Sequence, residues 1–165
     1  MLTDTYPAAN TPALKGENRE SAADAIENNI RKKVVEKILI NPLYYENMSA
    51  ILDDLIKKRR DGAIAYEQLL EHYIDLVNKS ESPENNTRYP ESIRHSGAMR
   101  AFYDNCGEDE DLAMSLHQAV LDSKEHQFRH NEFKEHRIKK ALFAVLKDKD
   151  EVERVYNIVV EQGEY

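Results

Sequence analysis

The sequence predicts an all-α protein, a single helical domain of about six to seven helices with a long central loop. Two observations predict the helical class. Of the 165 residues, 41% are hydrophobic and 33% are charged, and only five are Gly and five are Pro, a composition typical of a helix-rich globular chain. Apolar residues also recur at intervals of three and four, the period of one helix face. The length suits one domain with its own core.

Residues 1–20 are predicted to be a linker or an N-terminal arm. This stretch mixes Thr, Pro, Ala and Asn without a hydrophobic period, and Pro7 and Pro12 interrupt any helix. The helical domain is expected to span residues 21–165, because the pattern changes at Ser21.

The first helical half is expected over residues 21–78 and to hold three helices. The apolar stripe of the first helix consists of Ile26, Ile30, Val34, Val35, Ile38 and Leu39. Asn41-Pro42 then ends that helix and caps a second one. The expected buried face of the second helix consists of Tyr44, Met48, Ile51, Leu52 and Leu55. This helix ends in four cations at residues 57–60, which oppose the macrodipole, and a third helix is expected from about residue 65 to 78.

The central loop is expected over residues 79–95, where Ser, Pro and consecutive Asn leave few apolar groups. The second helical half then covers residues 96–165. Ser96 is expected to cap a short helix, and a second helix is expected over residues 110–123. Two last helices are expected over residues 131–146 and from 148 to about 162.

The charge distribution limits the class of partner. The formal net charge of −8 argues against an unselective nucleic-acid binder, because phosphate affinity comes from accumulated Lys and Arg. The charge is nevertheless segregated: residues 104–122 hold six acidic residues and no Lys or Arg, whereas residues 124–147 hold seven basic residues and three acidic ones. One face of the protein is therefore expected to attract phosphate while another repels it.

The compartment is expected to be the cytoplasm. The single cysteine, Cys106, rules out an internal disulfide, and residues 2–9 lack the apolar run of a signal peptide. No stretch approaches the roughly 20 apolar residues that span a bilayer, so no membrane partner is expected.

No catalytic motif is recognised. The five glycines stand apart, so no phosphate-binding loop is present. The acidic run at residues 108–111 is interpreted as favourable charge at a helix N-terminus rather than as a magnesium site. His126 and His130 are four residues apart and could share a metal on a continuous helix, but we favour the interpretation that they are surface histidines, and we predict no metal. Cys106 is interpreted as a packing residue rather than a nucleophile.

Two basic clusters and two tyrosines are the candidate functional residues. The candidate DNA-binding residues are Lys57, Lys58, Arg59, Arg60, Arg129, Lys134, Arg137, Lys139 and Lys140. Phosphate contact by these clusters and their service as solvated or ion-paired helix surfaces remain open alternatives. Tyr45 and Tyr103 each belong to an aromatic pair, of which one member is expected in the core and the other at a protein interface.

The sequence resembles a known family over about residues 27–165. Residues 41–49, residues 52–60 and Tyr66-Glu67 resemble the pattern NPxYYExMSxxLDxLIxxRR…YExxL, which lies near the C-terminus of the motor (R) subunits of type I restriction endonucleases. The similarity continues at Tyr89-Pro90, at residues 100–105, at Arg129 and through the closing residues 159–165. The chain departs from the family pattern where Cys106 replaces Leu, His117 replaces Asp and Phe128 replaces Trp.

The resemblance implies a non-catalytic C-terminal helical domain. Its implied role is to dock the motor onto the methyltransferase and specificity subunits, with duplex DNA as a further partner. ATP and magnesium are implied for the parent subunit, an ATP-dependent deoxyribonuclease, but no cofactor is implied for this domain. The alternative is a duplex DNA-binding module without sequence preference that uses the basic helix faces.

Overall fold

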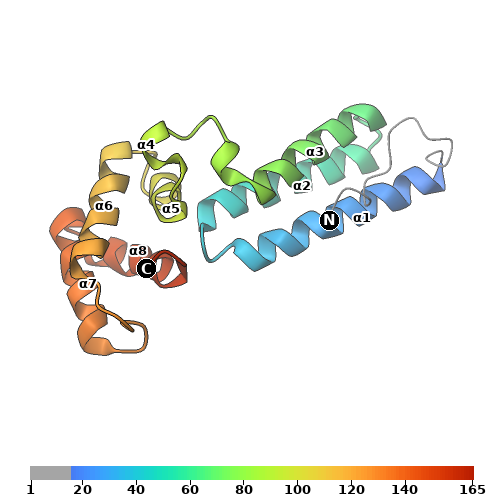
Figure 1. The fold of residues 1–165 in the computed structure, drawn as a ribbon. Coiled ribbons are helices and arrows are strands. Elements are labelled where there is room, and N and C mark those ends of the chain that lie inside the picture. Colours follow the sequence, from blue (N-terminus) through green and yellow to red (C-terminus); the bar gives the residue numbers. More distant parts are fainter. Residues whose placement is uncertain (1–15) are drawn as a thin grey trace. The chain divides into compact units, whose positions relative to one another are not determined.

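The computed structural model describes residues 16–165, and within them every regular element is helical (Figure 1). The helices are α1 (Glu17–Lys37), α2 (Pro42–Arg60), α3 (Tyr66–Glu81), the 3-10 turn η2 (Pro83–Asn85), α4 (Glu91–Arg94), α5 (Gly97–Asn105), α6 (Glu110–Ser123), α7 (Glu132–Leu146) and α8 (Lys149–Glu161). The all-α class is confirmed. The described chain has more helices than expected because the short α4 forms inside the predicted central loop. No helix among these residues is long and apolar enough to cross a bilayer.

Within the predicted single domain, the described helices group into two compact units. The first unit comprises residues 16–36 and 45–83 and holds α1, α3 and most of α2. The second unit comprises residues 37–44 and 84–165 and holds α4 to α8. The boundary at residue 83 falls inside the predicted loop, whereas the sequence gives no sign that residues 37–44 belong with the second unit.

One apolar face on each helix builds the core of the first unit. Its buried apolar side chains are Ala23, Ile26, Ile30, Val34, Tyr45, Met48, Leu52, Leu55, Ile56, Leu69, Leu70, Tyr73, Leu76 and Val77. Ion pairs also join α1 to its neighbours. The Arg31–Asp53 pair spans 2.5 Å to α2, and the Lys33–Glu81 pair spans 2.6 Å to α3. The three helices are therefore bound by apolar packing, with exposed ion pairs adding little each.

The observed helix α1 differs from the predicted one at both ends. The helix begins at Glu17, inside the predicted arm, because Arg19 ties the first turn to α3. Its guanidinium carbon lies 4.8 Å from the ring centroid of Tyr66. At the other end α1 stops at Lys37, and Val35, predicted on the buried stripe, is 75% exposed. The rest of the predicted arm, residues 1–15, lies outside the described residues.

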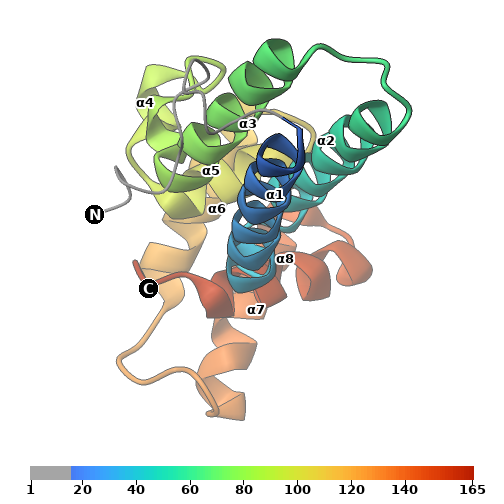
Figure 2. The same ribbon diagram turned by 90° about the vertical axis from the view of Figure 1, so that its right-hand side faces the viewer.

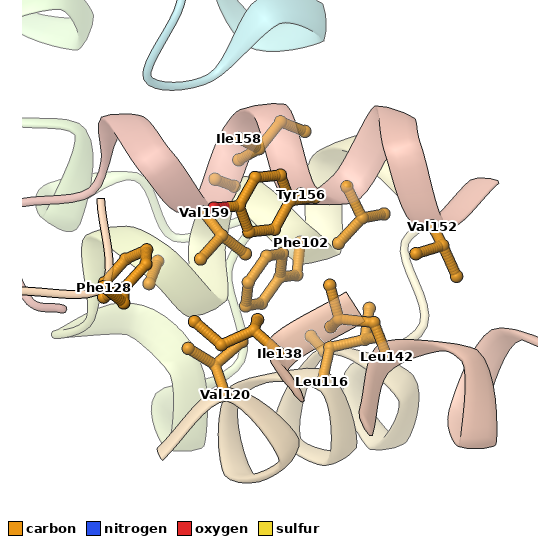
Figure 3. Close-up of a cluster of buried hydrophobic side chains, with 14 residues drawn as sticks. Phe102, Leu116, Val120, Phe128, Ile138, Leu142, Val152, Tyr156, Ile158 and Val159 are labelled. Carbon is orange, nitrogen blue, oxygen red and sulfur yellow. The ribbon is translucent and has the colours of Figure 1, made fainter. Parts of the chain in front are cut away.

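The second unit has a core to which all of its longer helices contribute (Figure 3). Its buried members are Ala98, Ala101, Phe102, Ala113, Leu116, Val120, Phe128, Ile138, Leu142, Val152, Val155, Tyr156, Ile158 and Val159. The helix α6 packs against α5 and α7, and α7 packs against α8. Figure 3 shows Phe102 pointing into the centre of this cluster. The buried residues of α6, α7 and α8 therefore recur at the helical period, on one face of each helix.

Side-chain caps fix where these helices begin. The backbone N–H of Met99 donates to Ser96 Oγ at 3.1 Å, and that of Leu112 donates to Asp109 Oδ1 at 2.9 Å. Asn131 and Asp148 cap α7 and α8 in the same way. Each cap satisfies a backbone donor that the first helical turn leaves unpaired, which explains why these boundaries were predictable.

The closing residues 162–165 are fastened to the second unit. The Glu164 carboxylate accepts hydrogen bonds from Ser96 Oγ at 2.8 Å and from the Ala98 N–H at 2.9 Å. The ring of Tyr165 stacks on Phe102, with 6.5 Å between centroids. These contacts place a carboxylate at the N-terminus of α5, where the helix dipole favours negative charge.

Candidate functional site

The first predicted basic cluster lies at the C-terminal end of α2, as expected. Lys57 and Arg60 are exposed and make no ion pair with the part of the chain that the structure describes. Lys58 pairs with Asp54 one turn earlier, at 2.7 Å. Three of the four cations therefore face solvent, and two remain available to a partner.

Arg59, the remaining member of this cluster, is largely buried and binds carboxylates within the first unit. Its side chain is only 14% exposed, and it donates to Asp24 Oδ1 at 2.6 Å and to Glu27 Oε2 at 3.0 Å. Burial acts to lower the pKa of Arg59, but the hydrogen bonds and charges of these two carboxylates outweigh burial and raise it. The guanidinium of Arg59 therefore neutralises carboxylates inside the first unit, and its role in DNA binding stays a prediction.

Tyr73 joins Arg59, Asp24 and Glu27 in one hydrogen-bonded network. The side chain of Glu27 is 7% exposed, and it accepts the Tyr73 hydroxyl at 2.5 Å. Burial, followed by this hydrogen bond, raises the pKa of Tyr73 far above its ordinary value, so the hydroxyl stays protonated and remains a donor. Glu27 was not identified as a network member from the sequence, because a carboxylate on a predicted helix is normally solvated.

In the second predicted basic cluster, the first residue, Arg129, is likewise bound within the protein. Arg129 lies in the connection between α6 and α7 and donates to three carbonyl oxygens at the end of α8. Its Nε donates to Val160 at 2.8 Å, its Nη2 to Gln162 at 2.7 Å and its Nη1 to Tyr165 at 2.8 Å. The guanidinium therefore binds the C-terminal end of α8, where a cation also opposes the helix dipole, and the phosphate contact of Arg129 stays a prediction.

The four remaining basic residues of this cluster lie on α7. Three of them bind an acceptor within the described part of the chain, and one does not. Lys134 Nζ donates to the His126 carbonyl at 2.7 Å, Arg137 pairs with Glu125, and Lys139 pairs with Glu153 at 2.9 Å. Lys140 is exposed and has no ion pair among the described residues. The cluster therefore exists as a surface, but most of its side chains already have a partner within the protein, and two of them, Arg137 and Lys139, are ion-paired.

The two candidate interface tyrosines lie in packed positions. Tyr45 is 4% exposed and belongs to the core of the first unit, so its predicted interface role is wrong. Tyr44 is buried as well, so neither member of that pair faces solvent. Tyr103 is half-buried and stands edge-on to Tyr89, with 5.9 Å between ring centroids. The prediction assumed that one member of each tyrosine pair faces solvent, whereas Tyr44 and Tyr45 are both buried.

The remaining candidates for chemistry do not converge. His126 and His130 lie in the connection at residues 124–131 and not on one helix, so their spacing of four does not place them together. No group of three or more His, Cys, Asp and Glu side chains placed to hold a metal occurs within residues 16–165. Burial raises the pKa of Cys106, which makes its thiolate less accessible. The acidic run at residues 108–111 includes Asp109, the N-cap of α6.

A buried polar network around Asp104 was missed by the sequence analysis. The Asp104 carboxylate pairs with Arg88 and accepts hydrogen bonds from the Tyr89 hydroxyl at 2.5 Å and from Asn41 Nδ2 at 2.7 Å. Burial raises the pKa of Asp104, and the three partners counteract that rise. All four residues belong to the second unit, so the network joins residues 37–44 to the rest of it. Asn41 had been identified only as a helix cap.

The connection between α6 and α7 forms an ordered loop beside an open cavity of about 600 Å³. Phe128 is 2% exposed and anchors the loop in the core, while Gln127 and His130 adopt positive φ values of 55° and 65°. The cavity is lined by Lys124, Glu125, His126, Gln127, Phe128, Arg129 and Tyr165. The loop therefore holds a fixed shape on the surface.

The outer face of α7 carries two exposed aromatic side chains. Phe133 is 74% exposed and Phe143 is 43% exposed. On this face the helical period places the exposed residues Phe133, His136, Arg137, Lys140, Phe143 and Ala144, opposite the buried Ile138 and Leu142, and the exposed Lys147 follows as the C-cap of α7. The sequence analysis identified the cations of this face but not its phenylalanines.

Comparisons of the chain with protein-family models, with curated proteins and with solved structures give no match.

Proposed function

We propose that this chain is the C-terminal helical docking domain of a type I restriction motor subunit. Its role is to hold the motor on the methyltransferase and specificity subunits during ATP-dependent DNA translocation and cleavage. The proposal includes a cytoplasmic location, because such enzymes act on intracellular DNA, and it assigns ATP and magnesium to other parts of the parent subunit.

The resemblance over residues 41–60 is the observation that carries the proposal. The motif contains a proline at the first position of α2 and its Asn41 cap. It also contains buried tyrosines and a cationic helix end, so the structure explains why most positions of the motif have these residue types. The remaining letters and the similarity at residues 100–105 and 159–165 support a common family rather than a common helix pattern. Exposed apolar side chains on α7 support an interaction role, because they are available to a protein interface.

A titration tests the proposal. The purified chain is added to the methyltransferase–specificity complex of the same restriction system, with and without duplex DNA, at low and moderate salt. Binding in the absence of DNA is expected. If the chain binds only in the presence of DNA, and that binding disappears as salt rises, the docking role is contradicted.

The second candidate function is duplex DNA binding without sequence preference. The observation that favours it is that three members of the predicted basic clusters, Lys57, Arg60 and Lys140, are exposed and form no ion pair among the described residues. Replacing these three with Glu is expected to abolish salt-sensitive duplex binding if DNA contact is direct. The matched control replaces Lys58, Lys134 and Lys139, whose ammonium groups already bind a carboxylate or a carbonyl oxygen of the protein. Unchanged duplex affinity in the first variant would remove this candidate.

A further inference from the structure

We propose that the outer face of α7 is the docking surface, and that its partner is a protein that offers an apolar groove bordered by carboxylates. The proposal rests on the proposed function and deepens it by assigning the contact to one helix face. Its central side chains are Phe133, Lys140 and Phe143.

The geometry of α7 favours insertion of this helix face into a groove. Residues three, four, seven and eleven apart share one side of a helix, so Phe133, Arg137, Lys140 and Ala144 lie along one ridge, and Phe143 flanks it. The opposite side of α7 is anchored by Ile138 and Leu142, both fully buried. The ridge is therefore presented on a rigid support, and docking requires no change in the core.

The size and exposure of the phenylalanines indicate a protein partner. An exposed aromatic ring loses contact with water when it enters an apolar pocket, and aromatic residues are enriched at the centre of protein interfaces. Phe133 projects from the first turns of α7, and its 74% exposure means that nothing in the described chain covers it. A phosphate backbone would gain nothing from either ring.

The charges beside the rings specify the partner further. Lys140 and Lys147 are exposed and without ion pairs in the described residues, whereas Arg137 is compensated by Glu125. A hollow of about 360 Å³ adjoins the ridge and is lined by Asp122, Ser123, Lys124, Glu125, Arg137 and Lys140. Two free lysines are few for phosphate binding, which requires many neutralised charges, but they match a pair of carboxylates at the rim of a groove.

Binding measurements on surface variants test the proposal. The double variant Phe133→Ser, Phe143→Ser is titrated against the purified methyltransferase–specificity complex. We expect binding about 30-fold weaker than that of the unaltered chain, the loss typical of central interface residues. Lys140→Glu is expected to weaken binding about tenfold at low salt and less at high salt. The matched control is Val35→Ser, which removes an apolar side chain of similar exposure from α1.

The outcomes separate this inference from the proposed function. Loss of binding in the double variant but not in the control supports both. If the unaltered chain binds the complex and the double variant binds equally well, the α7 surface is refuted while the docking function stands. If the unaltered chain does not bind, both are refuted. If the double variant keeps its affinity for the complex but loses duplex DNA binding, the partner of this face is nucleic acid and the inference is wrong. Circular dichroism checks that each variant remains folded.

Discussion

Replacing Arg129 with Met is expected to destabilise the second unit strongly. The substitution keeps the length and apolar character of the side chain but removes the guanidinium that donates to the carbonyls of Val160, Gln162 and Tyr165. A hydrogen bond from a charged donor contributes about 1.5–3 kcal/mol. Because Arg129 is only half-buried, water can bind part of the carbonyl oxygens that the Met variant leaves without a donor. We therefore estimate the lost free energy as that of two hydrogen bonds at the lower end of this range, about 3 kcal/mol. The contact with the Phe128 ring, 4.6 Å from the guanidinium carbon, adds about 0.5 kcal/mol.

Urea unfolding and hydrogen exchange measure this effect. The free energy of unfolding of the second unit is expected to fall by about 3.5 kcal/mol, with faster exchange in the last turn of α8. Arg129→Lys is expected to recover less than half of the loss, because a single ammonium cannot reach three divergent carbonyls. The control is Lys140→Met, which removes an unpaired exposed cation and is expected to change stability by less than about 0.5 kcal/mol. Equal stabilities of the Arg129→Met and Lys140→Met variants would refute the assignment of Arg129 to the fold.

Three further predictions follow from buried or partly buried groups. Asp104→Ala removes the acceptor of several donors and is expected to cost about 3 kcal/mol in urea unfolding; a cost below about 1 kcal/mol would contradict the network. Leu116→Ala is expected to cost about 2–5 kcal/mol because Leu116 is fully buried, whereas Met114→Ala, on the exposed side of α6, should cost less than about 1 kcal/mol; similar costs would show that the inward face of α6 is assigned wrongly. Burial lowers the pKa of His117, so the neutral ring, hydrogen-bonded to the Tyr165 hydroxyl at 2.5 Å, stabilises the fold above the ordinary histidine pKa, and that contribution is lost as pH falls through the lowered value. Unfolding midpoints measured between neutral and mildly acidic pH should therefore fall less in His117→Gln than in the unaltered chain, and parallel profiles would contradict this role.

The sequence predicted local structure well because its signals are local. Asn41, Ser96, Asp109 and Asp148 each provide a side-chain acceptor at the N-terminus of a helix, and each caps one in the structure. The helical period likewise identified most inward faces. The boundaries that moved depend on contacts far along the chain: α1 begins early because Arg19 packs on α3.

The candidate site was predicted less well, because residue type alone does not reveal a charge's partner. A cation in a basic cluster looks the same whether it meets a phosphate, a carboxylate or a carbonyl. Arg59 meets buried Glu27, and Arg129 meets the end of α8. Both partners lie about 30 residues away, 32 from Arg59 and 31 for the first carbonyl of Arg129, and no local pattern announces them. The exposure of Phe133 was hidden for the same reason, since an apolar residue on a predicted helix is normally assigned to the core.

The most direct test of the docking role is assembly of the full motor subunit with and without residues 16–165. Each form is mixed with the methyltransferase and specificity subunits, and the mass of the product is measured by light scattering after size exclusion. ATP hydrolysis by the motor alone serves as the folding control. We expect the intact subunit to join the complex, and the shortened subunit to keep its basal hydrolysis but to elute separately. A shortened subunit that still joins the complex with unchanged affinity would contradict the account.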